Sequence, residues 1–154
     1  MNHLLKSELR DLVVNPLAWA SYAAWGAVWL TVSGAFGRPD QGFPSLTDGL
    51  LLAWLLCWMG CLLGDLFAPR IGTTLVAALT ALTMLALWYL RSGSVPILMI
   101  LLVTQFTVRL PPRWLPVALV ALNAYFYWIL VASWGADPEG ALVTLLGMAG
   151  FQLF

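Results

Sequence analysis

Long apolar stretches separated by short polar breaks limit what this chain can fold into. The hydrocarbon core of a bilayer is about 30 Å thick, and a helix crosses it with about 20 predominantly apolar residues. Hydrophobic residues make up 62% of the 154 residues and charged residues only 9%, whereas about 25% of a typical soluble domain is charged. The sequence therefore predicts an all-α, polytopic transmembrane helical bundle and excludes a water-soluble globular domain.

Polar and proline-containing breaks divide the chain into about six spans. Asn15-Pro16 is an N-cap residue followed by proline at the first helical position, which predicts the start of the first span. The break at 37–48 is rich in glycine, proline and polar residues and is expected to be a loop. We expect a bundle over 16–154 with five complete spans and a truncated last one, at about 16–36, 49–67, 71–90, 95–108, 114–134 and 140–154.

Residues 1–15 precede the bundle and carry both signs of charge. Leu5, Leu9 and Leu12 recur there at helical spacing, with polar residues between them. This pattern predicts a cytoplasmic amphipathic segment on the inner leaflet, and a terminus without fixed structure is the alternative.

The basic residues near the span ends predict the orientation, because Lys and Arg are enriched in cytoplasmic loops. An N-in, C-in bundle places most of them on the cytoplasmic side. Trp114 and Trp134 bracket the fifth span at about the 30 Å expected between two aromatic belts. The basic residues expected inside are Lys6, Arg10, Arg70, Arg109 and Arg113, and those expected outside are Arg38 and Arg91.

The fourth span is short. From Pro96 to Arg109 a helix rises only about 20 Å, which is less than the thickness of the hydrocarbon core. One interpretation is a helix that responds to membrane thickness through hydrophobic mismatch. The other is a helix that extends through Ser92 and Arg109 and lies tucked among its neighbours.

The residues that enzymes and metal sites need are nearly absent. His3 is the only histidine, which excludes paired-histidine haem ligation, HExxH zinc sites and Ser-His-Asp triads. Lys6 is the only lysine, which excludes a P-loop, and a formal net charge of zero gives no basic patch for nucleic acid. We expect no catalytic, cofactor-binding or metal-binding residues here. Cys57 and Cys61 are interpreted as small buried hydrophobic residues.

Asp65 is the one acid inside an apolar run, and an ionisable group at membrane depth is a functional candidate. In a transporter it would be a proton or cation site. Arg70 follows near the expected cytoplasmic end, so an interfacial acid or a short ion pair with Arg70 is the plainer interpretation.

Uncharged polar and small residues within the spans are candidates for helix packing. Gln105 and Asn123 are interpreted as hydrogen-bonding between helices, with a ligand or signalling role as the alternative. Gly60 and Gly64 form a GxxxG pattern that lets backbones approach closely. Packing within the bundle is favoured for this pair over a dimer seam.

Two segments, VPILMILLVTQFTVRLPPRW at 95–114 and GFQLF at 150–154, resemble the membrane part of bacterial sensor histidine kinases of the DesK-like type. In that family the last membrane helix passes into a cytoplasmic coiled coil, a phosphoacceptor helix and an ATP-binding domain. The resemblance implies a multi-pass protein of the bacterial inner membrane that forms a homodimer. ATP and Mg²⁺ are expected only in the kinase core, outside this chain, which acts on a response regulator.

The function implied by this resemblance is signal input, without catalysis by these residues themselves. Because the last span ends without a polar or basic flank, the natural chain is expected to continue into the cytoplasm. Lipid thickness or order, or a small apolar ligand, would shift the fourth to sixth helices, with Gln105, Asn123 and the Pro111-Pro112 turn as candidate positions. The alternatives are a small transporter or channel, and a structural membrane subunit.

Overall fold

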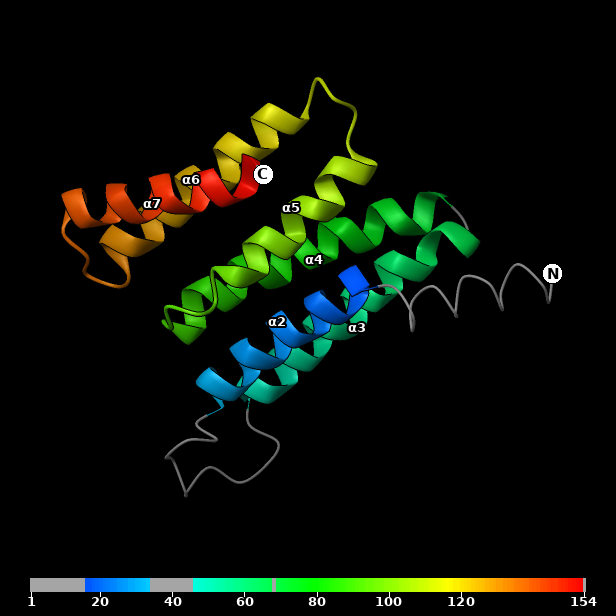
Figure 1. Ribbon diagram of the computed structural model, residues 1–154, viewed down its shortest axis with the longest axis horizontal. Helices are drawn as coiled ribbons and strands as arrows, with labels where there is room; N and C mark the ends of the chain where they lie inside the picture. Colours follow the sequence, from blue (N-terminus) through cyan, green and yellow to red (C-terminus); the bar gives the residue numbers. More distant parts are fainter. Residues whose placement is uncertain (1–15, 34–45, 68, 154) are drawn as a thin grey trace. The chain divides into compact units, whose positions relative to one another are not determined.

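The computed structural model describes residues 16–33, 46–67 and 69–153, and the side chains of 17, 64–67, 69, 70 and 153 lie outside this description. Within the described residues the chain is all-α, with no strand (Figure 1). The chain divides into two compact units, Met1–Leu82 and Thr83–Phe154. The helices are α2 (Pro16–Val32), α3 (Leu46–Phe67), α4 (Pro69–Leu90), α5 (Ile97–Arg109), α6 (Leu115–Ala132) and α7 (Pro138–Leu153).

The helices lie on the apolar runs, which confirms the expected all-α class, and α2 begins at Pro16 as predicted. The start of α7 differs from the predicted one. It begins at Pro138 rather than Gly140, because the Asp137 carboxylate accepts a hydrogen bond from the Gly140 N–H at 2.8 Å and so caps the helix. Pro138 then occupies the first helical position, where a missing N–H costs nothing.

The start of α3 also differs from its prediction. The helix begins at Leu46, so Asp48, which was expected in the loop 37–48, lies in its first turn. An acidic group is favourable there because it faces the positive end of the helix dipole. The other predicted features in 1–15 and 34–45 lie outside the described residues.

Tryptophans join α2 to α3 in the first unit. Trp25 and Trp29 stack with ring centroids 6.2 Å apart. Their indole N–H groups donate to the Leu51 carbonyl at 3.0 Å and to the Asp48 carboxylate at 2.8 Å. Each ring therefore packs as an apolar body while its polar atom finds an acceptor on the next helix.

α3 approaches α4 closely at Gly60. A Cβ added at Gly60 would lie 3.2 Å from Leu75 Cδ1, and the Cys57 thiol, one turn earlier, donates to the Leu75 carbonyl at 3.1 Å. Cys57 and Cys61 are both free thiols, Cys57 half-buried and Cys61 buried. The structure thus places Gly60 at a contact within the chain, whereas the surroundings of Gly64 lie outside the described residues.

In the second unit α5 packs against both α6 and α7 (Figure 1). Its 13 residues rise only about 20 Å. The helix does not extend through Ser92: tight i→i+3 turns precede it, the first from the Val95 N–H to the Ser92 carbonyl at 3.0 Å. α5 is therefore both short and buried, with Leu98, Met99, Leu101, Leu102, Val103, Gln105 and Phe106 in the core.

The C-terminal part of α4 is bonded to the segment 115–134. The Tyr125 hydroxyl donates to the Met84 carbonyl at 3.0 Å. Trp134 Nε1 donates to the Leu87 carbonyl at 3.1 Å. Tyr125 lies in the C-terminal half of α6 and Trp134 just after it, so the two bonds tie this end of the helix to α4.

A tight turn at Gly135 returns the chain along α6. Gly135 has φ of +72°, a backbone conformation that costs a residue with a Cβ about 1–2 kcal/mol. The Ala136 N–H donates to the Leu130 carbonyl at 2.9 Å and closes the end of α6. α7 consequently runs antiparallel to α6 and beside it (Figure 1).

Three stretches of the described helices are long and apolar enough to cross a membrane, which is fewer than the six predicted spans: Leu46–Leu63, Ile71–Leu90 and Leu115–Ala132. α2, α5 and α7 have 17, 13 and 16 residues, and each is shorter than the 18 residues that rise about 27 Å. Only 22–33% of each of the three stretches is buried. Apolar helices exposed to this degree are typical of a membrane protein, whose solvent is lipid.

Replacing Gly60 with isoleucine is expected to lower the free energy of unfolding by about 1–3 kcal/mol, because the new side chain overpacks against Leu75. The measurement is unfolding by sodium dodecyl sulfate in mixed micelles, followed by circular dichroism. Gly26→Ile is the matched control, because a Cβ at Gly26 would meet nothing within 4 Å beyond its chain neighbours and the backbone of its own helix. A Gly60→Ile protein that unfolds as the wild type but dimerises less would instead assign Gly60 to a dimer seam.

Candidate functional site

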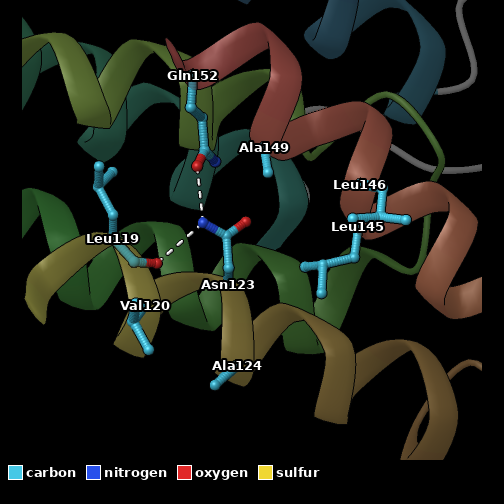
Figure 2. A pocket seen from close by; sticks show the side chains of 8 residues that line it. All are labelled: Leu119, Val120, Asn123, Ala124, Leu145, Leu146, Ala149 and Gln152. Atoms are coloured by element: carbon cyan, nitrogen blue, oxygen red, sulfur yellow. Dashed lines mark hydrogen bonds between the residues drawn. The ribbon is translucent and has the colours of Figure 1, made fainter. Parts of the chain in front are cut away.

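A groove runs between α6 and α7 in the second unit (Figure 2). Its volume is about 380 Å³, within the range of roughly 300–1,000 Å³ typical of small-molecule sites. Val120 and Leu146 on its walls are 70% and 64% exposed, so the groove opens at the surface of these two helices. The residues that line it are Leu119, Val120, Asn123, Ala124, Leu145, Leu146, Ala149 and Gln152.

Two side-chain amides meet at one end of the groove. Asn123 of α6 donates from Nδ2 to Gln152 Oε1 of α7 at 2.7 Å, and also to the Leu119 carbonyl one turn back at 2.9 Å (Figure 2). We call Asn123 and Gln152 together the amide pair. The pair joins two helices, whereas the Leu119 bond stays within α6.

The Leu119 carbonyl fixes the orientation of both amides. Because this carbonyl only accepts hydrogen bonds, Asn123 must direct its side-chain nitrogen toward it. The same nitrogen also donates to Gln152 of α7. Gln152 must then turn its oxygen toward that nitrogen. As a result Asn123 Oδ1 and Gln152 Nε2, both buried, have no hydrogen-bond partner within the described part of the chain.

The amide pair lies far from either end of α6. Asn123 is about 12 Å along a helix that begins at Leu115 and rises about 27 Å in total. If α6 crosses a bilayer, as its length and composition allow, the pair lies near mid-depth. An unsatisfied polar atom at that depth is costly, because lipid tails offer no hydrogen bonds.

The remaining candidate residues from the sequence lie elsewhere. Gln105 is buried in α5, at 6% exposure. Pro111 and Pro112 are exposed in the turn between α5 and α6, where the Trp114 N–H donates to the Pro111 carbonyl at 2.8 Å. Asp65 and Arg70 belong to α3 and α4, and their side chains lie outside the described residues.

Sequence reasoning named Asn123 but missed its partner. Gln152 is the single polar residue between Thr144 and the end of the sequence. An isolated amide in an apolar helix is a signal of helix-helix hydrogen bonding, and this signal could have paired it with Asn123.

Three stretches of the described helices are long and apolar enough to cross a membrane. The groove between α6 and α7 is lined by apolar side chains except for the amide pair. Within the described residues no group of three or more His, Cys, Asp or Glu side chains could hold a metal ion. No family model, curated protein or solved structure matches the chain, so the resemblance to DesK-like kinases stays a prediction.

A double-mutant cycle on Asn123→Ala and Gln152→Ala is expected to give a coupling free energy of about 0.6 kcal/mol and at most about 1.7 kcal/mol, the range for hydrogen bonds between membrane helices. The measurement is the free energy of unfolding in mixed micelles for the wild type, both single variants and the double variant.

The control cycle pairs Asn123→Ala with Thr144→Ala, because the Thr144 hydroxyl donates to the Gly140 carbonyl of its own helix at 2.9 Å. These two changes should add to within about 0.5 kcal/mol. Equal coupling in both cycles would contradict a specific bond between α6 and α7.

Proposed function

We propose that this chain is the membrane-embedded signal-input domain of a two-component sensor histidine kinase. It transmits a membrane or intramembrane stimulus through α7 to a cytoplasmic kinase core outside this chain. The hydrogen bond from Asn123 to Gln152 carries the proposal, because it ties α6 to the last turns of α7, the helix that would lead to the core. The resemblance of 95–114 and 150–154 to the DesK-like membrane part is the second support.

The energetics of the amide pair suit a switch. A sensor needs two packings that differ by only a few kcal/mol, so that a stimulus can favour either one. A hydrogen bond between membrane helices contributes about 0.6 kcal/mol on average, which biases the position of α7 without locking it. The short α5, packed against both α6 and α7, is where a change in bilayer thickness would act on the pair.

The proposal includes six spans in the bacterial inner membrane, with both ends of the bundle on the cytoplasmic side. Homodimerisation brings two kinase cores together, and ATP and Mg²⁺ act in those cores. A response regulator is the downstream partner. A transporter that used Asp65, and a structural subunit, are the competing functions.

Spin labels at Ala132 and Phe151 test whether α7 shifts relative to α6 when the bilayer thickness changes. Both residues are exposed, near the end of α6 and near the end of α7. With cysteine labels at these positions, and Cys57 and Cys61 replaced by alanine, we expect the distance distribution to shift across phosphatidylcholine bilayers of graded thickness. Double electron–electron resonance spectroscopy in reconstituted vesicles measures the distance between the two labels.

The matched control keeps the label at Ala132 and moves the other label to Val117, so that both labels lie on α6. This distance should stay constant across the same series. A constant distance from Ala132 to Phe151 would contradict signal input by membrane thickness. Proton or cation flux that is lost in Asp65→Asn would favour the transporter.

The mass of the native protein in its source membrane tests the kinase part of the proposal. We expect a mass well above that of the 154 residues, with tryptic peptides from a phosphoacceptor helix and an ATP-binding domain. A native chain that ends at Phe154 would overturn this part.

A further inference from the structure

Two exposed tryptophans lie at one level on two helices of the second unit. Trp88 of α4 and Trp128 of α6 stack with ring centroids 5.4 Å apart, and they are 45% and 50% exposed. Tyr125 packs against Trp128 with centroids 5.9 Å apart, and its hydroxyl donates to the Met84 carbonyl. The tryptophan stack is therefore held in place on both helices although it faces outward.

Both helices end shortly after this stack. α4 ends at Leu90, two residues after Trp88, and the polar residues 91–94 follow. α6 ends at Ala132, four residues after Trp128. Tryptophan is enriched where apolar helix surface meets lipid headgroups, because its ring is apolar and its N–H is polar. The stack has both the position and the chemistry of such a belt.

An exposed stripe runs along α6 from the stack to the other end of the helix. Its residues follow one another in steps of three and four, which places them on one helix face. A tryptophan stands at each end of the stripe, and small apolar side chains lie between. The exposed residues of this stripe are Trp114, Val117, Ala121, Ala124 and Trp128.

The order of side chains along the stripe indicates what covers it. Arg113 precedes Trp114, and polar residues follow the stack at the other end. The order is thus polar, tryptophan, apolar, tryptophan, polar, which is the order of the layers in a bilayer. A phospholipid bilayer matches this order over its whole length.

The spacing of the tryptophans measures the thickness of the apolar layer. Trp114 and Trp128 are 14 residues apart, which is a rise of about 21 Å, and helix side chains all tilt the same way, so their rings keep this spacing. Trp134 lies further along, but it is partly buried and its Nε1 donates to the Leu87 carbonyl. α5, packed against α6, independently rises only about 20 Å.

We propose that the second unit is anchored in lipid headgroups by Trp114 at one surface and by the stack of Trp88 and Trp128 at the other, and that it fits a hydrocarbon core of about 21 Å. The average core is about 30 Å thick. A thicker bilayer must therefore thin around the unit or draw the rings into hydrocarbon, and both are unfavourable. This inference concerns depth and lipid match alone and does not depend on signalling.

The first test measures depth with single nitroxide labels at Val117, Ala121 and Ala124. The whole chain, with Cys57 and Cys61 replaced by alanine, is reconstituted in dimyristoleoylphosphatidylcholine vesicles. Collision rates with oxygen and with a water-soluble nickel chelate report the depth of each label.

The deepest label identifies the centre of the apolar layer. Ala121 is midway between Trp114 and Trp128, so its label should be the deepest. Ala124 is midway between Trp114 and Trp134, and a deepest label there would overturn the proposal, as would a deepest label at Val117.

The second test measures lipid preference by quenching of tryptophan fluorescence with brominated dioleoylphosphatidylcholine. The shorter dimyristoleoyl lipid should displace the brominated lipid about threefold better than the longer dierucoyl lipid, because it needs less deformation around the unit. Equal displacement, or a preference for the longer lipid, would contradict the proposed fit.

A shifted belt tests whether the tryptophans set this preference. Trp128→Ala with Ala132→Trp moves one ring outward by about 6 Å on the same face, and Trp88→Leu removes the stack. The preferred lipid should change from the dimyristoleoyl to the dioleoyl lipid. The matched control has Ala132→Leu in place of Ala132→Trp and should lose the preference without moving it. The same shift in both variants would refute anchoring by the rings.

The depth test changes no tryptophan, so it decides the proposal even if the shifted variant fails to fold, as judged by helix content. It also tests the rival occupant. Spin-spin broadening at Ala121 that disappears on dilution with unlabelled chain would mean that a second copy covers the stripe, and would refute the proposal. A distance from Ala132 to Phe151 that stays constant with thickness would contradict the sensor proposal while leaving the depth result intact.

Discussion

Polar groups at membrane depth must find partners inside the protein, and this requirement governs both the local and the tertiary structure of the chain. Several hydroxyls meet it within their own helix. Thr80, Thr104 and Thr144 each donate to a carbonyl three or four residues earlier. Such bonds satisfy the hydroxyl but hold no two helices together, so tertiary structure needs other donors.

Aromatic side chains supply many of those other donors. Indole N–H groups of α2 reach α3, and Tyr125 and Trp134 reach carbonyls of α4. Trp88 and Trp128 add a stacked contact with centroids 5.4 Å apart. Trp134, which the sequence predicts as part of an aromatic belt, therefore also links two helices. A belt position and a structural hydrogen bond are compatible, because a ring at the interface still has one polar atom to satisfy.

Helix positions could be predicted from the sequence because long apolar runs and proline breaks set them locally. The helix caps were harder to predict from the sequence. The Asp137 carboxylate caps α7 by accepting one hydrogen bond from the Gly140 N–H, and hydropathy does not reveal such a bond. Helix pairing was hardest. A soluble helix reveals its buried face by its polar face, but these helices are apolar all round, so periodicity does not show which side packs. Periodicity does not place Gln152 on the side of α7 that packs on α6, so the signal that could pair it with Asn123 is its being an isolated amide in an apolar helix.

The amide pair connects the packing of this unit to its proposed function. Among the described residues it gives α7 a directional bond to α6, and it leaves one buried acceptor and one buried donor without a partner. A ligand can shift a packing equilibrium only by its differential affinity for the two packings. A packing that separates Asn123 from Gln152 loses the bond between them, so a stimulus must favour that packing by more than the bond contributes. Each tenfold difference in affinity corresponds to about 1.4 kcal/mol, more than the average hydrogen bond between membrane helices. A stimulus that favours the other packing tenfold therefore outweighs the amide bond in setting the position of α7.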